Sequence, residues 1–232
     1  MTGFALKDPK RIGVAVLGAG RMAQTHLRTL AGIDAADVIV VADPVAAAAE
    51  RGREIAHARR ASLDPVEAIH DPDVEVVVIV TPTSTHAPLI EEALRAGKAV
   101  WTEKPIAQEL GDTQRIVELW RETGLPCAVG FMRRHDPGYA RAKELIDAGE
   151  LGRIEQFHAY SRDVNPPPLE CLLHAGGSFL DMSTTSTSRA SWWARWRRSR
   201  PGPARCSTTA SRRRTTGTRP RSCCASATAR SA

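Results

Sequence analysis

Short apolar runs alternate with segments of helical spacing along the first 130 residues of the chain. The apolar runs have the length and the branched side chains of buried strands, and they span 12–17, 38–42, 74–80, 99–102 and 127–130. Parallel strands of this kind are joined by crossover helices, which cover both faces of the sheet. The pattern therefore predicts an α/β fold built on a doubly wound parallel sheet.

Three segments between these strands have apolar residues at helical spacing, over 21–31, 86–96 and 107–123. Their predicted buried stripes consist of Met22, Ala23, Leu27, Leu30 and Ala31 in the first, Leu89, Ile90, Ala93 and Leu94 in the second, and Ile116, Leu119 and Trp120 in the third. Beyond the sheet, a helix near 139–148 and an alternating stretch over 154–160 predict the start of a second, α+β domain.

The composition of the chain excludes several classes of protein. With 232 residues and 42% hydrophobic side chains, the chain is long enough for a substantial core, so a wholly disordered polymer is excluded. Its apolar runs are far shorter than the roughly 18 residues that a membrane span needs. The first residues lack the order of a secretory signal, so we expect a cytoplasmic protein. The five cysteines have no metal-ligand spacing, which predicts reduced thiols and no metal site.

The net charge of +6 is divided unevenly along the chain. Residues 183–232 contain twelve arginines and no lysine, aspartate or glutamate, so residues 1–182 hold 20 basic and 26 acidic side chains. The same last fifty residues include nineteen serines and threonines, and no valine, isoleucine, leucine or phenylalanine. Such a segment cannot bury enough apolar surface to fold. We therefore expect an acidic globular body followed by a disordered tail.

A glycine-rich turn follows the first predicted strand, in the sequence GVAVLGAGRMAQTH. Gly18 allows a tight turn, Gly20 lets the backbone approach a pyrophosphate at the helix N-terminus, and Ala23 permits close packing of the helix on the sheet. Asp43 ends the next strand, 25 residues beyond Gly18, where a carboxylate can accept hydrogen bonds from a ribose. These residues predict a dinucleotide site, with Arg21 and Met22 beside the phosphates.

The carboxylate of Asp43 would repel a 2'-phosphate, so the sequence favours NAD over NADP. Arg21 and nearby basic residues still leave NADP admissible as a cofactor.

Two further groups of residues follow later strands of the predicted sheet. Thr81 and Pro82 end one strand before His86 opens a helix, and Glu103 and Lys104 precede a proline at the end of the next. Ligands of open parallel sheets bind outside the carboxyl ends of the strands. Each group also has a plainer interpretation, in which His86 only starts a helix and the Glu103–Lys104 pair is a surface ion pair.

The motifs in this order, from the glycine turn through TPTSTH, EKPIA, GFMRRHDPGY and GGSFLDMS, resemble those of the glucose-fructose oxidoreductase and inositol 2-dehydrogenase (Gfo/Idh/MocA) family. The resemblance covers about residues 10 to 183, and EKP is its most specific element. It implies an N-terminal NAD(P)-binding Rossmann domain over 1–125. It further implies a C-terminal open-sheet domain for substrate and oligomer contacts, which begins at 126–182 and is incomplete here.

The same resemblance implies roles for individual residues. The catalytic lysine falls on Lys104 and the acidic active-site residue on Asp181. The substrate-contacting arginine falls on Arg133, where Met132 replaces an asparagine that many relatives carry. Thr81, Pro82, His86 and Glu103 would join the glycine turn in binding the cofactor. The implied activity is hydride transfer between a polyol, cyclitol or sugar and a nicotinamide cofactor, in an enzyme whose intact relatives are homo-oligomers.

The resemblance stops after residue 183. Where the family continues to a catalytic histidine, four residues after Asp181, this sequence has Thr185. A one-base shift of reading frame with GC-rich codons yields HDFDLARLVVGEVAEV, a family-like sequence, so we interpret 183–232 as translated out of frame. The chain would then be impaired and would not oligomerise. The alternatives are a non-catalytic nucleotide-binding remnant and, less favoured, an RNA-binding arginine-rich arm.

Overall fold

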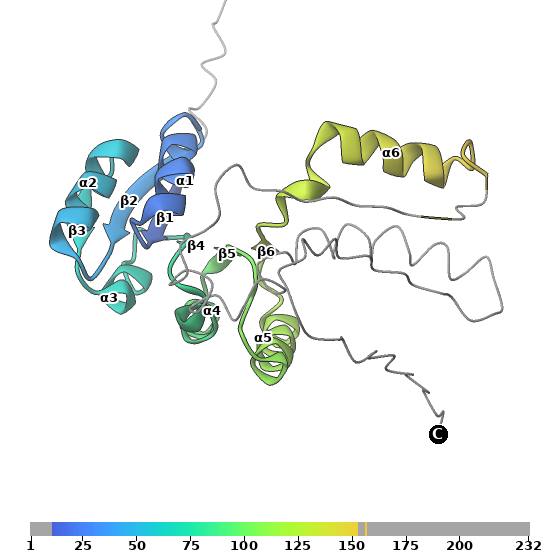
Figure 1. The fold of residues 1–232 in the computed structure, drawn as a ribbon. Coiled ribbons are helices and arrows are strands. Elements are labelled where there is room, and N and C mark those ends of the chain that lie inside the picture. Colours follow the sequence, from blue (N-terminus) through green and yellow to red (C-terminus); the bar gives the residue numbers. More distant parts are fainter. Residues whose placement is uncertain (1–10, 153–155, 157–232) are drawn as a thin grey trace, which may run out of the picture. The chain divides into compact units, whose positions relative to one another are not determined.

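The computed structural model describes residues 11–152 and residue 156. Within them, six parallel strands form one sheet in the order β3-β2-β1-β4-β5-β6 (Figure 1). The strands are β1 (Ile12–Leu17), β2 (Ala36–Ala42), β3 (Arg60–Ser62), β4 (Val76–Ile79), β5 (Ala99–Thr102) and β6 (Cys127–Val129). The predicted parallel sheet is confirmed, and all five strands expected from the sequence belong to it.

Helices connect successive strands of this sheet. They are α1 (Arg21–Ala31), α2 (Ala46–Ala56), α3 (Pro65–Ile69), α4 (His86–Arg95) and α5 (Leu110–Thr123), and α6 (Pro137–Asp147) follows β6. Short 3₁₀ turns, η1 (Thr83–Thr85) and η2 (Met132–Arg134), precede α4 and α6. Because β6 pairs with β5, the sheet continues past residue 125, where the sequence analysis ended the first domain.

Two apolar clusters lie on opposite faces of the sheet. One cluster joins side chains of α1 and α2 to β1 and β2, with Leu27 fully buried. The other joins α3, α4 and α5 to the sheet, with Ile69, Ile90 and Ile116 buried. Helices thus cover both faces, as expected for a doubly wound sheet.

Three residues of the predicted buried stripes are exposed instead, namely Met22, Ala31 and Trp120. Met22 is 52% exposed, whereas Ala23, the next residue of the same turn, is fully buried, so Met22 lies outside the face of α1 that packs on the sheet. Trp120 is 38% exposed at the last turns of α5, where its indole Nε1 donates to the Leu125 carbonyl at 2.7 Å. The four residues predicted for α4 are all buried.

Several predictions fall on residues outside the described part of the chain. They are the strand over 154–160, the active-site candidate Asp181, and the tail over 183–232. The described residues contain no helix that is both long and apolar enough to cross a membrane.

Candidate functional site at the carboxyl edge of the sheet

The turn after β1 requires glycine at its first position. Gly18 has φ +94°, in the left-handed region that side chains disfavour, and a Cβ there would lie 2.6 Å from the Val80 carbonyl oxygen. The Gly18 amide also donates to the Ala42 carbonyl at 2.7 Å. This residue therefore sits where the ends of β1, β2 and β4 meet, and the tight turn expected from the sequence is present.

The second glycine of the turn leaves space at the start of α1. Gly20 is the N-cap of this helix and offers no side chain to its first amides. A Cβ built on Gly20 would meet no atom within 4 Å, so the N-terminus of α1 opens onto free space. Ala23, one turn later, is fully buried against the sheet. Helix N-termini of this kind bind phosphate groups.

Asp43 is held in place by the turn itself. Its Oδ2 accepts a hydrogen bond from the Ala19 amide at 2.8 Å, and its Oδ1 accepts one from the Val45 amide at 2.9 Å. A carboxylate oxygen can accept more than one hydrogen bond, so both oxygens retain capacity for a ligand. The acidic residue and the glycine turn thus form one unit.

The loop after β4 is closed by its threonines. The Thr85 hydroxyl donates to the Pro82 carbonyl at 2.8 Å, and it lies 2.7 Å from Oγ1 of Thr81. Thr81 and Pro82 leave the sheet at the edge predicted for the cofactor, next to Gly18.

His86 does not present its ring to a ligand. It begins α4, as the plainer interpretation holds, but its side chain is only 1% exposed. Nδ1 lies 2.8 Å from the Pro105 carbonyl oxygen and Nε2 lies 2.9 Å from that of Thr81. Because both ring nitrogens already face backbone carbonyls, the ring offers no nitrogen for the predicted contact of His86 with the cofactor.

The segment after β5 brings Lys104 to the same edge. The Lys104–Pro105 peptide bond is cis, and the Lys104 amide donates to Oε2 of Glu103 at 3.1 Å. Oε1 of Glu103 lies 2.9 Å from Nε2 of His26, which comes from α1. Glu103 is thus tied to the helix that follows the glycine turn, rather than forming an isolated surface ion pair.

Electrostatics keep the Glu103 carboxyl ionised. Burial acts to raise its pKa, but the hydrogen bonds from His26 and the Lys104 amide, with the charges of both residues, lower the pKa below its ordinary value of 4.5. The carboxylate therefore stays charged beside Lys104 at neutral pH.

An aromatic ring supports this arrangement. The Trp101 ring lies 4.7 Å from the His26 ring, centroid to centroid, at an interplanar angle of 57°. A Cβ on Gly130 would lie 2.9 Å from the Trp101 ring and 3.5 Å from the Glu103 carboxyl carbon. Only glycine fits there without displacing the indole. The sequence analysis missed His26, because its partner lies 77 residues away and no local pattern links them.

The candidate substrate residue Arg133 lies on η2, just beyond β6. Its guanidinium carbon is 5.5 Å from the centroid of the Tyr139 ring at the start of α6. Asp136 caps that helix by accepting hydrogen bonds from the Gly138 and Tyr139 amides. Asp181, its expected companion at the substrate, is outside the described residues.

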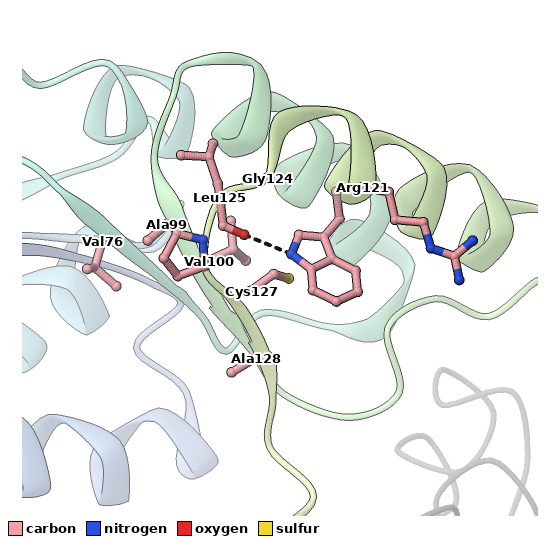
Figure 2. Close-up of a pocket in the computed structure, with 10 residues that line it drawn as sticks. Val76, Ala99, Val100, Arg121, Gly124, Leu125, Cys127 and Ala128 are labelled. Carbon is pink, nitrogen blue, oxygen red and sulfur yellow. Dashed lines mark hydrogen bonds between the residues drawn. The ribbon is translucent and has the colours of Figure 1, made fainter.

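The opposite edge of the sheet carries an apolar hollow (Figure 2). It is lined by the first residues of three strands, Val76, Ala99 and Cys127, together with the end of α5. Cys127 is a free thiol there, and burial raises its pKa. Because parallel strands bind ligands at their carboxyl ends, this hollow is separate from the candidate site. The described residues contain no cluster suited to a metal ion.

A parallel α/β sheet with a glycine turn, a paired aspartate and a lysine segment at its carboxyl edge defines a dinucleotide-binding domain of the Rossmann type. The chain belongs to the Gfo/Idh/MocA oxidoreductase family, whose NAD-binding Rossmann fold matches residues 12–131, just over half of the chain.

Several relatives carry names of inositol dehydrogenases. The chain is 41% identical to a scyllo-inositol 2-dehydrogenase (NAD(+)) from Bacillus subtilis over 174 residues, which are 75% of this chain and 51% of that protein. It is 38% identical to an inositol 2-dehydrogenase from Rhizobium meliloti, over 72% of this chain and 50% of the relative. The chain therefore spans about half the length of these relatives.

A solved structure has the same fold. The scyllo-inositol dehydrogenase of Lactobacillus casei, with bound NAD(H) and scyllo-inositol, superimposes with a TM-score of 0.60 and 31% identity. The match covers 62% of this chain and 43% of that one.

Proposed function

We propose that this chain is the cofactor-binding part of an NAD-dependent oxidoreductase acting on a cyclitol or a related polyol or sugar. One observation carries the proposal: the glycine turn, the Thr81 loop and the Lys104 segment are linked to one another at a single edge of the sheet. Gly18 packs on the Val80 carbonyl, and His26 of α1 binds Glu103. The names of the relatives supply the substrate class.

The described residues fit a dinucleotide. Free space over Gly20 and the uncapped start of α1 suit a pyrophosphate. Arg21 and Met22, the first two residues of α1, are the proposed neighbours of this group. Asp43, fixed by the Ala19 amide, suits the two hydroxyls of a ribose. When bound, NAD accepts a hydride at C4 of its nicotinamide. The residues proposed around that ring are Thr81, Pro82 and Glu103.

Lys104 is the proposed catalytic residue. Its ammonium group would donate a hydrogen bond to the reacting hydroxyl and stabilise the negative charge that develops on this oxygen. The ionised carboxylate of Glu103 lies next to Lys104 in the chain, and its negative charge offsets the positive charge of the Lys104 ammonium group. Arg133 would bind hydroxyl groups of the substrate.

Oxidation of a secondary alcohol to a ketone removes a hydride and a proton, and the proton needs a base. The family resemblance implies a histidine as that base, oriented by Asp181, at a position where this chain has Thr185. A hydroxyl is not a base near neutral pH. Loss of a positioned base costs about 10² to 10⁴ in rate. We therefore propose that the chain binds NAD but turns over poorly, which makes a non-catalytic nucleotide-binding protein the second candidate.

The test has two parts. NADH and NADPH are titrated into the purified chain by fluorescence, and the proposal expects tighter binding of NADH. NAD reduction is then assayed on a panel of cyclitols and sugars, for this chain and for a version with the reading frame restored after residue 183. Turnover only by the restored version would support the proposal that the unaltered chain is catalytically impaired. Equal turnover by both versions would show that the reaction does not require the missing histidine. Failure of the unaltered chain to bind either cofactor would contradict the proposed function.

A further inference from the structure

A buried histidine joins two loops of the candidate site. The His86 ring has one nitrogen 2.8 Å from the Pro105 carbonyl and the other 2.9 Å from the Thr81 carbonyl. Thr81 lies two residues after the end of β4, at the start of the loop that leads to α4, while Pro105 directly follows Lys104. With 1% exposure, the ring has no contact with solvent through which to bind a ligand.

Burial makes these hydrogen bonds consequential. Burying a polar group lowers the stability of a protein unless the group is hydrogen-bonded. The buried His86 ring is therefore stable at this position only when its hydrogen-bond partners are in place. A neutral imidazole donates through one nitrogen only, while the doubly protonated ring donates through both. In the neutral form, the ring can therefore donate a hydrogen bond to only one of the two carbonyls. The carbonyl of Pro105 is the one that belongs to the segment containing Lys104.

We propose that His86 is a positioning residue, which holds the Glu103–Pro105 segment against the end of β4 through an Nδ1–H hydrogen bond to the Pro105 carbonyl. This sets where Lys104 stands. The inference rests on the proposed function only for the catalytic role of Lys104, because the contact itself involves no cofactor or substrate.

The segment has a second attachment on its other side. Nε2 of His26 lies 2.9 Å from Glu103, so Lys104 stands between two residues that are each held by an imidazole from a different helix. Removal of the His86 contact therefore loosens one side and leaves the other in place. The expected effect is local disorder of the segment and not its complete release.

Two conservative variants separate the two ring nitrogens. In His86→Asn the side-chain amide nitrogen takes the place of Nδ1 and can still donate to Pro105. In His86→Gln the amide nitrogen takes the place of Nε2 and can donate only toward Thr81. His86→Ala removes both donors. His70→Asn is the matched control, since His70 is a largely exposed histidine paired with Glu92 and outside the site.

The measurement is hydrogen exchange of the Lys104 amide in the full chain, because this N–H donates to Glu103 and reports on the segment directly. We expect exchange about tenfold faster in His86→Gln and His86→Ala than in the parent, and within about threefold of the parent in His86→Asn. Amides of β4 serve as the internal reference for global stability, and His70→Asn should match the parent throughout.

Equal acceleration in the Asn and Gln variants would overturn the proposal, as would protection by Gln and not by Asn. Acceleration at Lys104 only in step with β4 would also overturn it, since that pattern means general destabilisation. Where a version of the chain oxidises a cyclitol, kcat should fall about tenfold in the Gln variant with KM for NAD unchanged. Lack of turnover in every version would count against the proposed function and leave the exchange result intact.

Discussion

At the scale of single residues, the two glycines of the turn after β1 serve different physical demands. Gly18 meets a backbone requirement, because its φ of +94° and the nearby Val80 carbonyl both reject a side chain. The space beside Gly20 is open and its backbone is extended, so the proposed demand on this position comes from a ligand and not from the fold. The two demands predict opposite outcomes for the same substitution.

Gly18→Ala should lower the free energy of unfolding by about 2 kcal/mol or more, through left-handed strain and the clash with the strand. Gly20→Ala should change it by under about 1 kcal/mol. The second variant should instead weaken NADH binding about tenfold or more, as the methyl group occupies the proposed pyrophosphate position. Urea unfolding and NADH titration of both variants check this pair. A stable Gly18→Ala protein would contradict the strain argument.

Asp43 is predicted to set the cofactor preference. Asp43→Asn retains an acceptor oxygen for the turn but loses the charge, so the preference for NAD over NADP should narrow by about tenfold. Parallel titrations with NADH and NADPH measure the ratio. Asp37→Asn is the control, since Asp37 lies in β2, the strand that precedes Asp43, but pairs with Arg59. An unchanged ratio in Asp43→Asn would show that the carboxylate does not discriminate the phosphate.

At the scale of elements, the accuracy of the sequence analysis follows the strength of the apolar pattern. The spans of β1, α1 and β5 agree with the prediction to the residue, because branched aliphatic or amphipathic runs are bounded there by glycine or polar residues. The stretch from α2 to α3 has no apolar run or amphipathic pattern of this kind. Helix α2 is rich in alanine, β3 has three residues including an arginine, and α3 has five. Asp64 before Pro65 is a local helix-start signal for α3.

The candidate site likewise consists of features that the sequence predicts and of contacts that it does not. The glycine turn, Asp43 and the Lys104 segment are short continuous motifs, which can be found in one sequence. The contacts of His26 with Glu103 and of His86 with Pro105 join residues far apart in the chain, and only the folded sheet brings them together. Met22 shows the converse error, since helical spacing assigned it to the buried stripe of α1, whereas the residue is 52% exposed.

Helix packing gives a stability prediction with its own control. Ile90→Ala on α4 removes a fully buried side chain from the core and should cost about 2 to 5 kcal/mol of unfolding free energy. Met22→Ala on α1 should cost under about 0.5 kcal/mol, because that side chain is exposed. Chemical denaturation of the two variants measures the difference. Comparable losses would mean that Met22 is buried after all.

The link between α1 and the Lys104 segment predicts a pH dependence. The pKa of Glu103 is lower in the folded chain than its ordinary 4.5, so the folded state favours the ionised form. This contribution to stability is fully present above the unfolded pKa and is lost as pH falls through the folded pKa. The stability difference between the parent and Glu103→Gln should therefore shrink below about pH 4.5. Unfolding curves from pH 7 to pH 3 test this, and a constant difference would contradict the assignment.

At the scale of the whole molecule, cofactor binding should be visible as stability. A ligand that binds only the folded state at 100 times its Kd adds about 2.7 kcal/mol. NAD should therefore raise the Tm of the unaltered chain, and NADP should raise it less at equal concentration. Thermal scans with each cofactor measure both shifts. The Gly20→Ala variant is the control, and a full NAD shift in that variant would indicate binding elsewhere.

The strand order has a consequence for the order in which the polypeptide is made. The central strands β1 and β4 are neighbours in the sheet, and the loops that follow them carry part of the proposed cofactor site. All described residues proposed to bind the cofactor or to lie beside it, from Gly18 to Pro105, belong to one continuous stretch of the chain. Synthesis proceeds from the N-terminus, and domains fold as they emerge. The part of the chain that carries the proposed cofactor site can thus form on the ribosome before Arg133, the proposed substrate residue, has been translated.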